Sequence, residues 1–200
     1  MDDSGAMHNG ACADHLMGRS GLDSSLNRVL ERKELTPDTV ELRILNRDVA
    51  RYCHPGQFVI VRGDEVGERI PLTIADFNRQ EGSVTLVIQK VGDATIRLGA
   101  LKKHDLIRDM AGPLGHHTDI AKFGTVVVIG GGLGIAPAFP IQRGMKEAGN
   151  RVISIIGARK KSLLFWEERM RSYSDDLFIA TDDGSLGEKG YVTTVLKRLI

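Results

Sequence analysis

The segment from Thr125 to Gln142, TVVVIGGGLGIAPAFPIQ, constrains the fold of this chain more than any other. Its apolar run, Val126 to Ile129, leads directly into three glycines, which is typical of a buried parallel strand that ends in a tight turn. Residues 135–148 then have helical character, with Pro137 near the start, where a helix tolerates proline. Backbone N–H groups and the positive end of a helix dipole would meet at such a turn, which predicts a site for a pyrophosphate.

The same segment departs from the usual dinucleotide fingerprint, GxGxxG. Gly130 and Gly132 fit the pattern, but Ile135 stands at the third glycine position. The acidic residue expected after the next strand is also missing. Because a glycine turn of this kind can be purely structural, the interpretation depends on the rest of the chain.

Length and charge exclude several classes of protein. The 200 residues suit one or two small domains, and a net charge of +1 gives no support for nucleic-acid binding. The sequence has no apolar run of about 20 residues that would span a membrane, and its start does not resemble a secretory signal. The two cysteines, Cys12 and Cys53, are too few for a four-thiolate cluster. We expect inert thiols in a cytoplasmic protein.

Residues 1–25 are rich in Gly, Ser, Asp, Ala and His and show no periodicity. They are predicted to be a disordered or non-native tail. His8, Cys12 and His15 could be metal ligands, but a solvated tail is the simpler interpretation, and no metal site is expected.

Short strands separated by turns follow the tail. Alternating apolar residues predict strands over 27–34 and 39–45, and further strands are expected over 57–62, 69–75, 83–91 and 106–110. Turns are expected at 36–38, 55–56, 81–82 and 112–115, and a short helix over 93–101, capped by Asp93. This pattern predicts a small antiparallel β-barrel over residues 26–117.

The pattern changes after His117 to strands that alternate with helices. Strands are expected over 125–129, 152–156 and 177–180, and further helices over 163–171, capped by Ser162, and 191–199. This order predicts a Rossmann-like parallel sheet with crossover helices over residues 122–200.

The hexapeptide from Arg69 to Ile74, RIPLTI, is the second informative stretch. A proline in a strand belongs at an edge or a break, where one face is free for a ligand. The guanidinium of Arg69 can bridge phosphate oxygens, and the hydroxyl of Thr73 can donate to a ring nitrogen. Without other signals, such a hexapeptide is more often an ordinary strand than a site.

Five motifs in a fixed order support a family resemblance over residues 26–200. They are RIPLTIAD (69–76), GPLG (112–115), GGGLGIAPAFP (130–140), GARKK (157–161) and TDDGSLGEKG (181–190). Together they resemble the ferredoxin–NADP reductase superfamily. Within it, the chain is most similar to the electron-transfer subunits of dihydroorotate dehydrogenase and to the small subunits of sulfide dehydrogenase and NADH-dependent ferredoxin:NADP oxidoreductase.

The resemblance implies an FAD-binding barrel followed by an NAD(P)-binding domain. It also implies that electrons pass from NAD(P)H through FAD to an iron–sulfur or catalytic partner subunit. On the barrel, Arg69 would contact the flavin phosphates, Pro71 would shape the strand, and Thr73 would lie near the reactive flavin nitrogen as the catalytic candidate. The other FAD contacts implied are Leu72, Ile74, Gly92, Ala94 and Thr95.

The resemblance places the nicotinamide nucleotide along three loops. The implied contacts are Gly130, Gly131, Gly132 and Gly134 for the pyrophosphate, Gly157, Ala158 and Arg159 for the adenosine ribose, and Asp182, Asp183 and Gly184 near the nicotinamide. Ala136 and Pro137 are further implied cofactor contacts. Asp182 and Asp183 also fit a solvated turn. Arg159, Lys160 and Lys161 favour NADP, whereas the relatives include NADH users, so the choice stays open.

The chain also departs from the family. Family members carry a C-terminal segment with a last strand and the cysteines of a 2Fe–2S cluster, whereas this sequence stops at Ile200 without those cysteines. We therefore expect no cluster in this chain. Two functions other than electron transfer by a flavoprotein stay open. One is a truncated scaffold or regulatory subunit, and the other is a nucleotide-binding module without flavin. His116 and His117 could act as acid–base groups, but a surface loop is the simpler interpretation.

Overall fold

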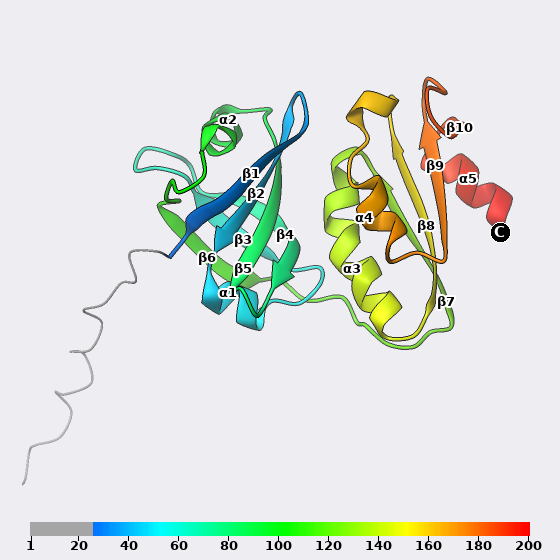
Figure 1. The fold of residues 1–200 in the computed structure, drawn as a ribbon, viewed down its shortest axis with the longest axis horizontal. Helices are drawn as coiled ribbons and strands as arrows, with labels where there is room; N and C mark the ends of the chain where they lie inside the picture. Colours follow the sequence, from blue (N-terminus) through cyan, green and yellow to red (C-terminus); the bar gives the residue numbers. More distant parts are fainter. Residues whose placement is uncertain (1–25) are drawn as a thin grey trace, which may run out of the picture.

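A computed structural model of the chain describes residues 26–200. They form two lobes that lie side by side, one built on an antiparallel sheet and the other on a parallel sheet (Figure 1). The expected fold class is therefore confirmed. The expectations for residues 1–25, including the tail, Cys12 and the candidate ligands His8 and His15, lie outside the described residues.

The first lobe is a closed six-stranded barrel. Its strands follow the order β1 (Arg28–Thr36), β2 (Thr39–Leu45), β5 (Ser83–Gln89), β4 (Ile70–Asn78), β3 (Phe58–Arg62) and β6 (Asp109–Leu114). The barrel closes because Arg28 bridges to Leu106 and the N–H of Val29 donates to the carbonyl of Asp105 at 2.9 Å. Alternate residues of β2 point inward and are fully buried, which makes them part of the barrel core.

Two short helices pack against the barrel, α1 (Arg47–Tyr52) and α2 (Asp93–Ala100). Helix α1 was not predicted from the sequence. It begins at Asn46, whose side-chain oxygen accepts the N–H of Val49 at 3.0 Å. This is the N-cap geometry that starts a helix, and it could have been recognised from the sequence.

The last barrel strand differs from the prediction. A strand over 106–110 and a turn over 112–115 were expected, whereas β6 runs from Asp109 to Leu114 and includes the cis peptide bond Gly112–Pro113. The pairing of β6 with β3 shifts register between Phe58 and Ile60. A strand with an irregular register tolerates a proline that a regular ladder would not.

The second lobe is a four-stranded parallel sheet. Its strand order is β10 (Glu188–Lys189), β9 (Asp176–Thr181), β8 (Arg151–Ala158) and β7 (Thr125–Gly131). Helices α3 (Ile135–Glu147) and α4 (Glu167–Arg171) lie between this sheet and the barrel, and α5 (Val192–Leu199) covers the opposite face (Figure 1).

Strand β7 was expected to be buried, and this expectation was wrong. Within residues 26–200 it pairs with β8 alone and forms one edge of the sheet. Val127 and Ile129 are 39% and 37% exposed. The apolar residues of α5 pack mainly against β8 and β9, so this face of β7 is only partly covered.

The helix after β8 begins later than expected. Ser162 was predicted to cap a helix over 163–171, but Lys161–Leu163 forms a single 3-10 turn and α4 begins at Glu167. The residue before α4, Trp166, has a left-handed backbone with φ of 59°. Its indole N–H donates to Glu41 of the barrel at 2.8 Å, so a contact between the lobes competes with the local helical preference.

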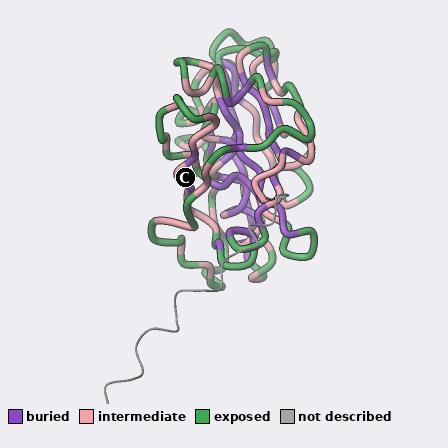
Figure 2. The backbone as a smooth tube through the Cα atoms, turned by 90° about the vertical axis from the view of Figure 1, so that its left-hand side faces the viewer, coloured by how far each residue is buried: buried purple, intermediate pink, exposed green. Residues whose placement is uncertain are grey.

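The lobes share an apolar interface. Ala75 of β4 and Val87 of β5 pack against Phe139 of α3 and against Phe165. Figure 2 shows buried backbone running through the interior of the molecule, with exposed backbone around it. The chain passes between the lobes through residues 115–124. The predicted end of the barrel domain at 117 and start of the second domain at 122 stay predictions. Within the described part of the chain, no helix combines the length and apolar character that a membrane span requires.

Candidate functional site

The barrel half of the candidate site is one face of β4 and the residue before it. Arg69, Pro71 and Thr73 alternate along the strand and are exposed. Leu72 and Ile74 point the other way, into the barrel core. The structure thus brings the first three predicted residues onto a common surface, whereas Leu72 and Ile74 could reach a ligand there only through backbone atoms.

The guanidinium of Arg69 belongs to a small charged cluster. Its Nη2 lies 3.2 Å from Oδ2 of Asp109, which also accepts Nε of Arg62 at 2.6 Å. Two guanidiniums facing one carboxylate leave excess positive charge. Because the side chain of Arg69 is 61% exposed, it remains accessible to an anion.

The loop before α2 is shaped by Thr95. Its hydroxyl accepts the N–H groups of Val91 and Gly92, both at 3.0 Å, and donates to the carbonyl of Gly92 at 2.8 Å. These bonds occupy the hydroxyl, which therefore orders the loop. The cap of α2 is Gly92, not Asp93 as predicted, since Asp93 is already helical and pairs with Arg97. A methyl group on Gly92 would meet no atom within 4 Å, so a ligand has room to approach the backbone.

The glycine turn after β7 has two kinds of glycine. A Cβ on Gly130 would lie 2.8 Å from Cα of Ile135, so Gly130 permits the turn to pack on itself. A Cβ on Gly131, Gly132 or Gly134 would meet nothing within 4 Å. The N–H of Ile135 donates within the 3-10 turn and Pro137 has no N–H, so a phosphate would approach the backbone of the glycine turn itself, where the open space lies.

The other two residues predicted at this turn, Ala136 and Pro137, already belong to α3. Ala136 is 2% exposed and packs in the interface cluster, and Pro137 is half-buried in the first turn of α3. They support the start of the helix, and the side chain of Ala136 does not face the solvent.

A cavity of about 240 Å³ lies where β7, β8 and β9 end. Open α/β sheets bind ligands at this carboxyl edge. Six of the predicted residues line the cavity: Gly131, Gly132, Gly157, Ala158, Arg159 and Asp182. Tyr191 and Val192 also line it and were missed, although their position at the start of the terminal helix, directly after Gly190, is a usable signal.

Gly130, Gly134, Ala136 and Pro137 of the glycine turn do not line this cavity, and neither do Asp183 and Gly184, the other two residues predicted near the nicotinamide. An oxygen of Asp183 accepts the N–H of Ser185 at 2.9 Å, and hydrogen bonding from Ser185 lowers the pKa of the Asp183 carboxyl. Gly184 has a φ of +76° in the same turn. This geometry fits the alternative of a solvated turn for both residues.

The remaining candidates lie apart from both surfaces. His116 and His117 are exposed in the segment between the lobes, and the ring of His117 lies 5.3 Å from that of His54.

A larger cleft of about 630 Å³ lies between the lobes beside the second half of α3, and no predicted site residue lines it. Its walls include His54, Asp76, Arg79, Arg143 and Tyr173.

Cys53 is buried, and burial raises the pKa of its thiol to about 11. We therefore expect Cys53 to resist a thiol-reactive disulfide reagent at pH 7 in a Cys12→Ser variant. Labelling of the folded protein should be at least about 100-fold slower than labelling in denaturant. Rapid stoichiometric labelling of the folded protein would show that the thiol is accessible.

Comparison with known proteins places the chain in a family. No protein-family model matches it. A Thermotoga maritima protein named dihydroorotate dehydrogenase B (NAD(+)), electron transfer subunit homolog, is 40% identical over 176 residues, which cover 88% of this chain and 62% of the relative. The electron transfer subunit from Fusobacterium nucleatum is 33% identical over 177 residues, covering 86% and 68%. This chain belongs to the dihydroorotate dehydrogenase B electron transfer subunit family.

A solved structure agrees with this assignment. It is described as an NADH-dependent reduced ferredoxin-NADP oxidoreductase that performs flavin-based electron bifurcation, and it matches with a TM-score of 0.84 and 38% identity. The match covers 88% of this chain and 63% of that one. The expected ferredoxin reductase-like resemblance is thus confirmed. The chain spans about three fifths of the length of the first of these relatives.

Proposed function

We propose that this chain is a flavoprotein electron-transfer component. It binds FAD on the barrel and NAD(H) or NADP(H) at the ends of β7 to β9, and it passes electrons to an iron–sulfur or catalytic partner subunit. The observation that carries the proposal is the open space over three glycines at the start of α3, since these backbone groups can approach a pyrophosphate. The names of the relatives support the same activity.

Each surface has a defined task in this proposal. Arg69 binds the phosphates of the flavin, and the first N–H groups of α2, which follow the loop ordered by Thr95, donate to the same diphosphate. The exposed hydroxyl of Thr73 donates to the flavin ring. When bound, FAD accepts electrons in pairs and releases them singly, and the protein supplies binding and orientation.

The proposal is tested by the visible spectrum. Purified protein mixed with FAD should show flavin absorbance after gel filtration, and anaerobic NADH or NADPH should bleach it. A colourless protein would contradict the flavin site. A yellow protein that neither nucleotide bleaches would favour the scaffold or regulatory subunit instead.

Arg159 is expected to set part of the nucleotide preference. It lines the cavity directly after β8, where a guanidinium can bind a 2′-phosphate. We expect Arg159→Ala to weaken NADPH binding about tenfold, the loss of roughly one charge-assisted contact. NADH binding should change less than about twofold.

Fluorescence titration of both nucleotides measures these affinities. Arg151→Ala is the matched control, because Arg151 begins the same strand at the opposite edge and pairs with Asp176 at 2.8 Å. An equal loss of NADH and NADPH affinity in Arg159→Ala would exclude a role in selection.

A further inference from the structure

One buried carboxylate of the barrel is held by two arginines of the other lobe. Asp76 of β4 is 9% exposed. Its Oδ1 accepts Nη1 of Arg143 from α3 at 2.5 Å, and its Oδ2 accepts Nη2 of Arg169 from α4 at 2.6 Å. The contact therefore joins both interface helices to a single side chain.

A second carboxylate completes the cluster. Glu41 of β2 is 8% exposed, and its Oε2 lies 3.8 Å from Nη1 of Arg169 and accepts the indole N–H of Trp166 at 2.8 Å. Two acids of the barrel thus face two arginines of the second lobe, and their formal charges cancel. We call Glu41, Asp76, Arg143 and Arg169 the interlobe latch.

Aromatic rings hold the arginines of the interlobe latch in place. The guanidinium of Arg169 lies 4.4 Å from the ring of Trp166 and 4.9 Å from that of Phe139. Arg143 lies 4.8 Å from the ring of Phe77. Rings on these sides restrict the arginine rotamers and cover part of each guanidinium, which strengthens the ion pairs.

A β-bulge directs Asp76 toward the other lobe. The pairing of β4 with β5 shifts register between Ile74 and Asp76. Regular alternation after Thr73 would have turned Asp76 into the barrel. The extra residue instead lets both Ala75 and Asp76 face the interface.

The interlobe latch lies on the elements that carry both candidate cofactor surfaces. Thr73 and Asp76 are three residues apart on β4, or about 10 Å along a strand. Arg143 lies eight residues after Ile135, the first residue of α3, or about 12 Å along a helix. A displacement at Asp76 would therefore pass along two rigid elements to both surfaces.

We propose that the interlobe latch sets how the nucleotide site meets the flavin site, with Asp76 as a positioning residue. This inference rests on the proposed function. The apolar interface attracts the lobes but lets them slide, because apolar contacts are not directional. Directional ion pairs from one carboxylate to two arginines fix one register. Hydride transfer depends on such a register, since a misplacement of about 1 Å can cost about 100-fold in rate.

The test compares Asp76→Asn with Asp175→Asn in the full chain. Asp175 is the matched control, since it accepts Nζ of Lys146 at 2.6 Å and the N–H of Val152 at 2.7 Å within one lobe. Trp166 is the only tryptophan of the sequence, so its emission reports on the interface without any cofactor. In flavin-free protein, Asp76→Asn should shift the emission to the red and increase acrylamide quenching roughly threefold. Asp175→Asn should leave both unchanged.

Anaerobic flavin reduction supplies the second readout. At saturating nucleotide, Asp76→Asn should lower the rate constant about 10- to 100-fold, with FAD and nucleotide affinities within about twofold of wild type. Asp175→Asn should reduce its flavin normally. If Asp76→Asn does not fold, Arg143→Lys replaces it, because lysine keeps the charge but loses the planar guanidinium that bonds Asp76 beside the ring of Phe77.

The outcomes separate the two proposals. Wild-type emission together with a wild-type reduction rate in the Asp76 variant would overturn the positioning role. A wild-type protein that binds FAD but is not reduced would contradict the proposed function. In that case the tryptophan emission still decides whether the interlobe latch sets the arrangement of the lobes.

Discussion

Replacing Gly130 by alanine is expected to destabilise the protein by about 2 kcal/mol and to abolish nucleotide binding. The added methyl group would lie 2.8 Å from Cα of Ile135 and 3.1 Å from the carbonyl oxygen of Gly134. Both atoms are backbone, so relief requires movement of the turn that starts α3. That movement would carry the helix N-terminus away from the proposed phosphate site.

The neighbouring change Gly131→Ala is the matched control, with little expected effect on stability. The backbone of Gly131, with φ of −112° and ψ of 133°, suits alanine, and a Cβ there meets nothing within 4 Å. The free energy of unfolding should therefore stay within about 1 kcal/mol of wild type. Because Gly131 lines the nucleotide cavity, the methyl group should still weaken nucleotide binding at least about tenfold.

Urea unfolding and nucleotide titration measure these two quantities separately. The proposal needs the Gly131 variant to lose binding and keep stability. Normal nucleotide binding by the Gly131 variant would show that the glycine turn does not contact the nucleotide. Equal stability of the two variants would contradict the close packing described for Gly130.

Removing the guanidinium of Arg69 is expected to weaken FAD binding about 10- to 100-fold. One or two charge-assisted hydrogen bonds to phosphate account for a change of this size. Arg69→Lys should recover only part of the affinity, since lysine keeps the charge but cannot bind two oxygens in a fork. Flavin fluorescence on titration with apoprotein measures the dissociation constants.

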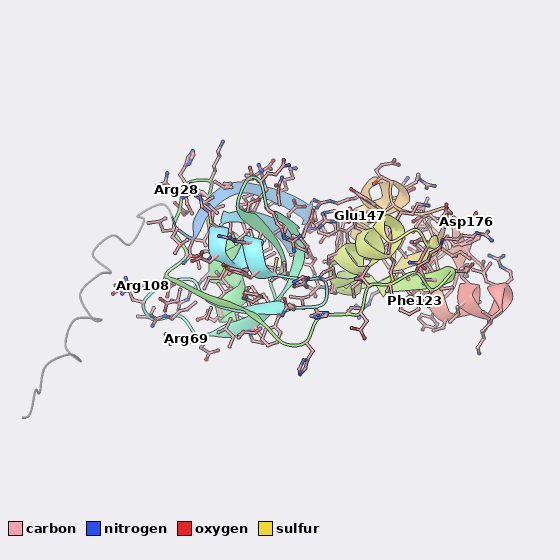
Figure 3. The ribbon with its side chains drawn as sticks, turned by 90° about the horizontal axis from the view of Figure 1, so that it is seen from below. Arg28, Arg69, Arg108, Phe123, Glu147 and Asp176 are labelled. Carbon is pink, nitrogen blue, oxygen red and sulfur yellow. The ribbon has the colours of Figure 1, made fainter. Side chains whose placement is uncertain are left out.

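Arg108→Ala is the control for Arg69. Both arginines lie on the barrel lobe, away from Glu147 and Asp176 of the other lobe (Figure 3). Arg108 is 54% exposed and lies 3.5 Å from Glu65, so the two arginines have similar exposure and one acidic neighbour nearby. A loss of FAD affinity in both variants would point to the overall charge of the lobe and not to a contact by Arg69.

The sheets could be read from the sequence because their signals are local. Alternation in 39–45 and apolar runs next to glycines in 125–129 correctly predicted strands of both sheets. The predicted element boundaries are wrong where contacts between residues far apart in the sequence determine the structure. The start of α4 depends on Trp166 reaching Glu41, a pair 125 residues apart, and the extent of β6 depends on its register against β3.

In the candidate site, too, local features could be predicted from the sequence and contacts between distant residues could not. The glycine turn carries its chemistry in adjacent residues, so the sequence located it. Thr95 was identified, but its hydrogen bonds within the loop could not be foreseen. Asp76 lies within a recognised motif, yet its partners Arg143 and Arg169 are 67 and 93 residues away, and only the folded chain brings them together.

The position of α5 determines the edge at which a further parallel strand can join the sheet. Helix α3 links β7 to β8 on the face toward the barrel, and α5 lies on the opposite face. A right-handed crossover on one face moves along the sheet in the direction opposite to a right-handed crossover on the other. Any parallel strand reached through α5 is therefore directed to the free edge of β7, where Val127 and Ile129 offer apolar surface. By handedness alone, the extension point of the sheet is the strand that ends in the glycine turn.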